Sequence, residues 1–340
     1  MTESNPSPGR IRNIAELARI AGVSTGTVSR ALANKPLVNK ETRERIQAIA
    51  REHGFRPNQM ARRLRVQETK VIGVVVPLGH DRRQHLSDPF FMTILAGLAD
   101  LLTESGYDIM LSRVIPEQTD WLEQIVDSGM LDGVLLIGQS DQFDAIERVA
   151  ERYRPMIVWG HHETGQKHCS VGVDNRLGGR MAGEHLIARG CRRLAFMGDV
   201  GPIEFRQRHL GLADACIAAG IEPPLVLPTH VSADGMIEEI ATKLDGLEGQ
   251  IDGIAAASDL IAMQTVRVLA DRGLAVPDQI AVVGFDNLPL AEQTIPRLTT
   301  ISQHVPEGAR AMVKALFARI AGEDTPSVIM QPELVVRDTA

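Results

Sequence analysis

The pattern of apolar and polar positions along the chain changes near residue 70. Before that point, apolar residues recur at helical spacing in short segments, and each segment follows a residue that caps helices well. These capping residues are Asn13, Ser24 and Asn39. They predict three helices, with the second over 25–33 and the third ending near Gly54. A fourth short helix is expected over 59–64, so the N-terminal part of the chain is predicted to be all-α.

After residue 70 the apolar residues form short continuous runs, beginning with VIGVVVP at 71–77. A run of that kind, bounded by turn residues, is typical of a buried parallel strand. Further strands are predicted at Asp108–Ser112, Gly133–Ile137, Met156–Trp159, Ser170–Val173, Leu194–Met197, Gly253–Ala256 and Ile280–Val283. Amphipathic stretches lie between most of them, among them Phe91–Ser105, Leu177–Arg189 and Ile261–Gly273. This alternation predicts doubly wound parallel sheets, and about 270 residues of it exceed one ordinary domain, so we expect two lobes.

The first two predicted helices, in the segment IAELARIAGVSTGTVSRAL, are joined by a short turn that contains Gly22. This arrangement is typical of a helix-turn-helix, in which the second helix enters the major groove of DNA. Early residues of that helix contact base edges, which suits Thr25 and Arg30, while hydroxyl groups contact phosphates. The candidate phosphate contacts are Ser24, Thr27 and Ser29, and Gly26 contributes shape rather than a side chain. An ordinary helical hairpin is the alternative from these residues alone.

The charge of the chain is divided unevenly. The whole protein has a net charge of −7, which is unusual for a DNA-binding protein. The first 70 residues hold 14 Lys and Arg against 6 Asp and Glu, a balance of +8, and the remainder holds 22 against 37, a balance of −15. A basic N-terminal segment in an otherwise acidic chain indicates a surface that attracts DNA phosphates. A solvated basic helix surface produces the same numbers of charged residues.

Composition narrows the class of protein further. Aromatic residues make up 4% of the chain, which argues against an aromatic-rich sugar-cleaving cleft or a nucleic-acid stacking platform. The three cysteines, Cys169, Cys191 and Cys216, form no CxxC pair and fit a reducing cytosol. The sequence has no apolar signal segment at its start and no run of about 18 apolar residues, so we expect a cytoplasmic protein.

Motifs of catalysis and metal binding are missing from the sequence. It contains no GxGxxG or GxxxxGK[ST] loop, and the segment 138–140 lacks the second glycine of a nucleophile elbow. Four potential metal ligands lie close together, namely His161, His162, His168 and Cys169. They lack the spacing of HExxH or CxxC sites. We therefore expect no enzyme activity, no bound metal and no cofactor.

Two N-terminal motifs, AGVSTGTVSRAL and KETRERIQAIAREHGFRPNQMARRL, resemble the start of the LacI-type repressor family. The resemblance continues in order through VIGVVVP, DPFF (88–91), LDGVLLIG (131–138), VGVDNRLGGRMAGEHLIARG (171–190), IAVVGFDN (280–287) and PRLTTISQ (296–303). It implies an all-α helix-turn-helix DNA-binding domain, a hinge helix, and an α/β periplasmic-binding-protein-like core of two doubly wound parallel-sheet lobes. The chain departs from the family pattern at Ala33, where Asn is frequent, and at Gly26, which is small for a base-contact position.

The resemblance also implies boundaries for each part of the chain. They are a flexible tail (1–12), a helix-turn-helix domain (13–56), a hinge helix (57–66) and an effector-binding core (67–340). The first lobe of the core is expected over 70–174 and 302–328, and the second over 175–301 and 329–340. Three chain crossings between the lobes are expected near 173–176, 300–303 and 328–331.

Further DNA contacts are implied in and before the segment PNQMARRLR. The resemblance implies that this hinge helix orders on operator DNA and inserts Leu64 into the minor groove, with Arg62 near a phosphate. A solvated linker helix is the alternative. Asn34, Asn58 and Ala61 complete the expected DNA-binding set.

In the core, the resemblance implies a cleft that closes around a polar small molecule. Arg206 is expected to bind sugar hydroxyls or a carboxylate, and Asp259 and Asp286 are expected at strand ends that face the cleft. Asp259 is also a candidate helix cap. Candidate stacking faces are Phe90, Phe91 and Trp159, with a place in the apolar core as the alternative for each.

These observations together predict a homodimeric, ligand-responsive repressor of a carbohydrate-utilisation operon that a sugar inducer releases from its operator. A co-repressor response is an alternative within the same class of regulator. A sugar-binding protein without DNA function is an alternative from another class, but that class predicts a signal peptide and no DNA-binding head. An enzyme of doubly wound fold requires the motifs that are missing.

Overall fold

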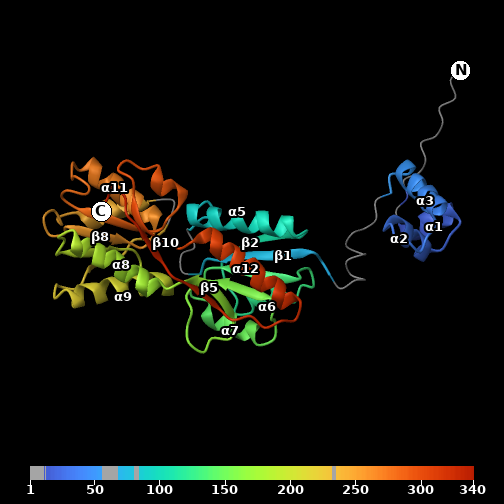
Figure 1. Ribbon diagram of the computed structural model, residues 1–340, viewed down its shortest axis with the longest axis horizontal. Coiled ribbons are helices and arrows are strands. Elements are labelled where there is room, and N and C mark those ends of the chain that lie inside the picture. Colours follow the sequence, from blue (N-terminus) through green and yellow to red (C-terminus); the bar gives the residue numbers. More distant parts are fainter. Residues whose placement is uncertain (1–10, 12, 56–67, 80–83, 232–234) are drawn as a thin grey trace, which may run out of the picture. The chain divides into compact units, whose positions relative to one another are not determined.

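The computed structural model describes residues 11, 13–55, 68–79, 84–231 and 235–340. The chain divides into two compact units, Met1–Thr69 and Lys70–Ala340. Figure 1 shows the first unit as a group of short helices and the second as layered helices and strands. The hinge helix predicted over 57–66 lies outside the described residues. Within the described part of the chain, no helix is both long and apolar enough to span a bilayer.

In the described part of the N-terminal unit, three short helices surround a small apolar core, as the sequence predicts for its first three helices. They are α1 (Ile14–Ala21), α2 (Thr25–Leu32) and α3 (Lys40–Glu52). The side chains of Asn13, Ser24 and Asn39 accept hydrogen bonds from the backbone N–H groups of Glu16, Thr27 and Thr42, at 2.9, 3.1 and 2.8 Å. Leu17, Val28 and Ile46 are fully buried between the helices. Ile11 is buried in the same core, so the flexible tail predicted over 1–12 extends too far, because an apolar residue near its end packs against the helices.

The first sheet of the larger unit has six parallel strands in the order β11-β5-β4-β3-β1-β2. They are β1 (Val71–Pro77), β2 (Asp108–Val114), β3 (Gly133–Ile137), β4 (Met156–Trp159), β5 (Cys169–Val173) and β11 (Val328–Met330). One face is covered by α5 (Pro89–Glu104) and α12 (Val305–Ile320), and the other by α6 (Trp121–Val126) and α7 (Phe143–Ala150). Because side chains alternate along a strand, Val74 of β1 packs toward α5 and α12, and Val75 packs toward α6 and α7. This sheet and its four helices form the first lobe.

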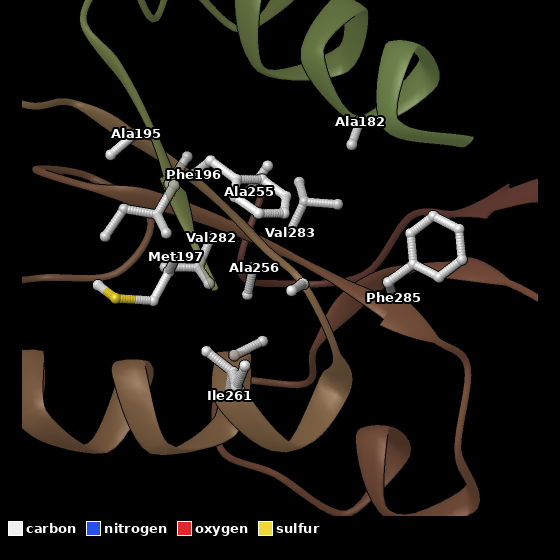
Figure 2. Packing of buried hydrophobic residues seen from close by; sticks show 14 of the residues in the cluster. Ala182, Ala195, Phe196, Met197, Ala255, Ala256, Ile261, Val282, Val283 and Phe285 are labelled. Carbon is white, nitrogen blue, oxygen red and sulfur yellow. The ribbon is translucent and has the colours of Figure 1, made fainter. Parts of the chain in front are cut away.

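The second sheet has the order β12-β10-β9-β8-β6-β7, parallel except for β12, which runs antiparallel to β10. Its strands are β6 (Leu194–Met197), β7 (Leu225–Leu227), β8 (Gly253–Ala256), β9 (Ala281–Asp286), β10 (Thr299–Ser302) and β12 (Glu333–Val335). The helices of this second lobe are α8 (Asn175–Ala188), α9 (Ile203–Ala218), α10 (Met236–Leu244), α11 (Asp259–Asp271) and the 3₁₀ helix η1 (Pro289–Glu292). Figure 2 shows the strand residues Phe196, Ala255 and Val283 between Ala182 of α8 and Ile261 of α11. The predicted doubly wound architecture is therefore confirmed.

The chain passes between the two lobes three times, after β5, after β10 and after β11. Met330 still pairs in the first sheet and Glu333 already pairs in the second, so the third passage lies between them. The lobe boundary expected after residue 328 therefore shifts, since β11 continues to Met330. Ser302 pairs with a strand of the second sheet, which moves that residue to the second lobe. These boundaries depend on which strands pair with each other, and the sequence motifs do not show that pairing.

Both sheets reverse their strand order at one point. In the first sheet β1 lies between β2 and β3, and in the second β6 lies between β7 and β8. In doubly wound sheets, ligands bind outside the carboxyl ends of the strands at such a switch point. The segments that follow β1, β3, β6 and β8 are therefore where a binding site is expected.

Candidate functional site

A cleft of about 690 Å³, which includes open solvent at its mouth, is lined by residues from the carboxyl ends of both sheets. The aromatic lining residues are Phe90, Phe91, Trp159 and Phe205. The larger polar ones are Gln84, Asp88, Glu204, Arg208, Asp286 and Gln303. Apolar and polar groups thus converge on one space between the lobes.

Three aromatic side chains form the wall that the first lobe contributes. Helix α5 begins after Asp88, whose Oδ1 accepts a hydrogen bond from the backbone N–H of Phe90 at 2.9 Å. The ring centroids of Phe90 and Trp159 are 6.0 Å apart, with their planes inclined by 54°. Phe91 and Trp159 are almost wholly buried, whereas Phe90 is half-buried. Phe90 is therefore best placed to offer a ring face to a ligand, and the other two belong equally to the apolar core.

Arg208 and Asp286 form the charged centre of the second lobe's wall. Arg208 projects from α9, and its Nε donates to Oδ1 of Asn175 at 2.8 Å while its Nη1 donates to the carbonyl of Ala257 at 2.5 Å. The guanidinium lies 3.7 Å from the ring centroid of Phe285. Nη1 is 3.9 Å from Oδ1 of Asp286, so the ion pair is close but is not a tight hydrogen bond. This spacing leaves part of both charged groups available to a ligand.

Burial controls the protonation of this pair. Removal from water raises the pKa of Asp286 well above its ordinary value of 3.8, against the opposing charge of Arg208. Burial likewise lowers the pKa of Arg208, against the attraction of Asp286, but a guanidinium stays charged in proteins. The backbone φ of Asp286 is +133°, a conformation that L-residues rarely adopt and that tends to be retained at binding sites.

Glycines at the crossing of α8 and α9 position Arg208. A Cβ added at Gly179 of α8 would lie 1.9 Å from the carbonyl oxygen of Arg208, so no side chain fits there. A Cβ at Gly211 of α9 would lie 1.9 Å from the carbonyl oxygen of Arg176. The two helix backbones are therefore in direct contact, which holds the start of α9 against the carboxyl edge of the second sheet.

Arg206, which the sequence analysis assigns to the cleft, is exposed and does not line it. Two residues along a helix turn a side chain by about 200°, so Arg206 and Arg208 face opposite sides of α9. The buried residues of α9 include Leu212 and Ala215, which share the face of Arg208. That helical period is the signal in the sequence that distinguishes the two arginines.

Asp259 is also displaced from its expected role, because it lies beneath the cleft and does not line it. Its Oδ2 accepts from the backbone N–H of Leu288 at 2.7 Å, and its Oδ1 accepts from Oγ1 of Thr300 at 2.5 Å. Burial raises the pKa of Asp259 to about 6. The cap of α11 is its neighbour Ser258, which does line the cleft. Gln84, Glu204 and Gln303 are lining residues that the sequence analysis missed, since no motif marks them.

The DNA-binding candidates of the N-terminal unit gather on and around α2. Thr25 and Arg30 are exposed, and a Cβ added at Gly26 would lie 3.5 Å from Nη2 of Arg30. Ser24 caps the helix, and its Oγ lies 2.9 Å from Oγ1 of Thr27, so both hydroxyls have intramolecular partners. Ser29 is half-buried on the same helix. The residues expected from the hinge segment, Asn58, Ala61, Arg62 and Leu64, lie outside the described residues.

Asn34 follows α2 with a backbone φ of +54°. Its Oδ1 accepts a hydrogen bond from Nε2 of Gln47 at 2.8 Å, and the same nitrogen lies 3.2 Å from the carbonyl oxygen of Ala31. Gln47 of α3 therefore holds the end of α2, and through it the orientation of the helix that carries the base-contact candidates.

The histidine-rich segment after β4 is tied into the first lobe. His168 is buried, with its Nδ1 2.5 Å from Oε1 of Glu147 and its Nε2 3.0 Å from Nε2 of Gln139. The sulfur of Cys169 donates toward the carbonyl of Pro326. Among the described residues, no group of three or more His, Cys, Asp or Glu side chains is arranged to hold a metal ion.

Comparisons with known proteins identify both units. The profile of bacterial regulatory proteins of the lacI family matches residues 13–58, and that of the periplasmic binding protein-like domain matches residues 184–340. The chain is 30% identical over 332 residues to the HTH-type transcriptional regulator CelR of Thermobifida fusca, covering 95% of this chain and 96% of CelR. It is 29% identical over 335 residues to the ribose operon repressor of Halalkalibacterium halodurans, covering 96% of each.

Solved structures agree with the sequence relatives. A complex of CelR with cellobiose is 28% identical, with a TM-score of 0.66 over 97% of this chain and 100% of that one. A LacI family regulator from Enterococcus faecium with bound ribose is 26% identical, with a TM-score of 0.68 over 79% of this chain and 98% of that one. The lac repressor dimer bound to operator and an anti-inducer, 24% identical, has the same fold, with a TM-score of 0.82 over 97% of this chain and 99% of that one. The chain therefore belongs to the LacI family of bacterial transcription regulators, with the helix-turn-helix unit as its DNA-binding domain and the two-lobed unit as its periplasmic-binding-protein-like core.

Proposed function

We propose that this regulator is a cytoplasmic repressor of a carbohydrate-utilisation operon, and that a sugar bound in the cleft releases it from its operator. The observation that carries the proposal is the composition of the cleft. The half-buried ring of Phe90 comes from one lobe and the Arg208–Asp286 pair from the other. An apolar face combined with charged hydrogen-bonding groups suits the two faces of a sugar ring.

The names of related proteins support the same ligand class. CelR has been solved with cellobiose, and the Enterococcus faecium regulator with ribose. These sugars belong to those proteins, and for this chain they serve as first probes. The cleft is lined from both lobes, so a ligand there contacts both and favours one angle between them over another.

For the DNA side, we propose that two copies of the chain bind a near-palindromic operator. A helix-turn-helix reads about half of such a site, so a two-fold dimer presents two recognition helices to two inverted half-sites. Thr25 and Arg30 are the proposed base contacts, with the hydroxyl groups of α2 near phosphates. We further propose that Leu64 enters the minor groove when the hinge segment meets DNA.

The experiment is a titration of labelled operator DNA with the full-length protein, followed by fluorescence anisotropy, with and without cellobiose, maltose or D-ribose. A sugar that weakens operator binding supports an inducer response, whereas a sugar that strengthens it indicates co-repression. Random DNA of equal length, titrated at the same salt concentration, corrects for non-specific binding. If sugars bind the protein in calorimetry and none changes operator affinity, the proposed regulation is wrong.

A further inference from the structure

Two residues that line the cleft carry buried oxygens without partners. Among the described residues, Oε1 of Gln84 and Oε1 of Glu204 accept no hydrogen bond, although each atom is shielded from solvent. Gln84 precedes α5 in the first lobe, and Glu204 lies in the first turn of α9 in the second. A buried acceptor without a donor destabilises a fold, so native structures rarely retain one without a reason.

The surroundings of Gln84 determine which end of its amide is unpaired. Its Nε2 donates to Oδ2 of Asp88 at 3.0 Å, and its backbone carbonyl accepts from Nη2 of Arg113 at 3.0 Å. The Asp88 carboxylate can only accept a hydrogen bond, so it must face the amide nitrogen of Gln84. The amide oxygen of Gln84 is therefore the atom without a donor. Gln84 is 7% exposed, and these hydrogen bonds hold both its backbone carbonyl and its side chain.

Glu204 reaches toward the opposite lobe. A Cβ added at Gly160, the residue after β4, would lie 3.1 Å from Oε1 of Glu204. The carboxylate also lies in the first turn of α9. Oε1 of Glu204 therefore lies at the boundary between the two lobes and accepts no hydrogen bond from the described residues.

The other polar groups of the cleft leave acceptors in excess. Two nitrogens of Arg208, the cation among the described lining residues, are engaged by Asn175 and by the Ala257 carbonyl. Asp88 and Asp286 add carboxylates to the same lining. A ligand that complements this surface supplies hydrogen-bond donors toward both lobes.

From this geometry we propose that Gln84 and Glu204 are effector-binding residues that accept hydrogen bonds from two hydroxyl groups of an uncharged, polyhydroxylated ligand. The inference rests on the proposed function in one respect, namely that the cleft is the effector site. Each lobe contributes one of the two acceptors, so the ligand relieves an unpaired group on both sides at once. Without a ligand, neither oxygen accepts a hydrogen bond from the described residues.

The test compares full-length variants by thermal unfolding without ligand and by calorimetric titration with cellobiose, maltose and D-ribose. Glu204→Met removes the unpaired acceptor while keeping the length of the side chain. We expect its ligand-free melting temperature to rise by about 2–4 °C, because the unpaired acceptor is gone. Its affinity for whichever sugar binds the unmodified protein should fall by about tenfold or more.

Two companion variants sharpen the result. Glu204→Gln keeps an acceptor oxygen in the same place, so its sugar affinity should fall by only about threefold, between the unmodified protein and Glu204→Met. Gln84→Met should also weaken sugar binding by about tenfold, with little change in melting temperature because it loses the bond to Asp88 together with the unpaired oxygen. Arg206→Ala, on the exposed side of the same helix, is the matched control and should change neither quantity.

A lower ligand-free melting temperature for Glu204→Met would show that Glu204 is an ordinary structural residue, and the inference would be overturned. Unchanged sugar affinity in Glu204→Met and Gln84→Met would overturn it as well. If none of the three sugars binds the unmodified protein, the ligand-free melting temperature decides alone. Operator titration separates this inference from the proposed function, because sugar that binds through these residues without affecting DNA contradicts only the latter.

Discussion

At the scale of single residues, the second lobe keeps an unusual concentration of buried charge. Arg208, Asp259 and Asp286 are each at most 5% exposed, and they lie at the carboxyl edge of one sheet. Hydrogen bonds from Thr300, Leu288 and Gln303 satisfy much of this charge. Buried ion pairs rarely add net stability, and of these three residues Arg208 and Asp286 line the cleft, as the proposed ligand binding requires.

The pKa of Asp259 leads to a prediction about pH. Burial raises this pKa from 3.8 to about 6, so the folded protein holds the proton more tightly than the unfolded chain does. The resulting stabilisation is fully present below about pH 3.8 and is lost as the pH rises through about 6. The Asp259→Asn variant has no carboxyl group to titrate at this position. The unmodified protein should therefore lose up to about 3 kcal/mol of its free energy of unfolding, relative to the variant, between pH 4 and pH 7.

Urea denaturation of both proteins at several pH values measures this difference. Asp127 provides a control of opposite sign, because its hydrogen bond to Arg152 lowers its pKa and its stabilising effect appears as the pH rises. Asp127→Asn should therefore lose stability relative to the unmodified protein as the pH rises to about 4, and the difference should stay nearly constant from there to pH 7. A difference between Asp259→Asn and the unmodified protein that stays constant with pH would contradict the burial argument.

Arg30 has the longest side chain of α2 and is a proposed contact to a base edge. It is exposed, and the glycine one turn earlier leaves its guanidinium unobstructed. We expect Arg30→Ala to weaken operator binding by about 1–3 kcal/mol while non-specific binding changes little, because base contacts carry sequence information and phosphate contacts do not. Competition titrations of operator against random DNA measure both quantities. Arg19→Ala, an exposed arginine of α1, is the control, and equal losses on both DNAs would reject Arg30 as a base contact.

At the scale of elements, the contact between α8 and α9 determines where the charged centre lies. The two helices touch through backbone atoms at Gly179 and Gly211, with Gly183 close to Ala215 beside them. This contact leaves no space for a side chain to separate the helices. The start of α9, with both Glu204 and Arg208, is thereby held against the strand ends.

The prediction for this contact compares two glycines in helix interiors. Gly179→Ala places a Cβ 1.9 Å from the carbonyl oxygen of Arg208, so α9 must move; we expect about 1–3 kcal/mol of destabilisation and weaker sugar binding. Gly97→Ala, in α5, places a Cβ 3.5 Å from Cβ of Ala309, which is an ordinary contact. That variant should gain up to about 1 kcal/mol from helix propensity. Denaturant unfolding and calorimetry measure both effects, and equal behaviour of the two variants would show that the helix contact does not position the site.

At the scale of the whole molecule, three separate chain passages join the lobes, so rotation of one lobe against the other bends three segments together. The cleft lies where the lobes face one another, and its lining comes from both. A ligand that contacts both lobes therefore has a different affinity for each angle between them. In the proposed regulation, that difference is the free energy by which the ligand acts on DNA binding.

Linkage makes this coupling testable from either side. If a sugar lowers the affinity of the protein for its operator by some factor, operator DNA must lower the affinity for that sugar by the same factor. Calorimetric titration of the sugar into free protein and into the protein–operator complex measures the second factor. Anisotropy titrations of operator with and without sugar measure the first. Two factors that differ beyond error would require a second sugar site or a change in assembly.

The local structure and the class of protein follow from patterns of residues that are near one another in the chain. Three caps, at Asn13, Ser24 and Asn39, predict the helices of the N-terminal unit because capping is a contact between near neighbours in the chain. The apolar runs predict strands such as β3, β4, β6 and β8 with the bounds that the structure has, since a buried parallel strand is apolar on both faces. The motifs spread along the chain then identify the family.

The set of polar residues that line the cleft depends on how the core folds in three dimensions. Thr299–Ser302 has no apolar run to mark it as a strand, and its buried hydroxyls are satisfied by Asp259 and by the end of the chain. The helical period of α9 separates Arg208 from Arg206, but only the packing of α9 on α8 places that face at the cleft. Gln84 and Glu204 line the same cleft from positions 120 residues apart. Such positions depend on hydrogen bonds and packing between segments distant in the chain. No local pattern of residue types specifies them, so they follow only when the whole core has folded.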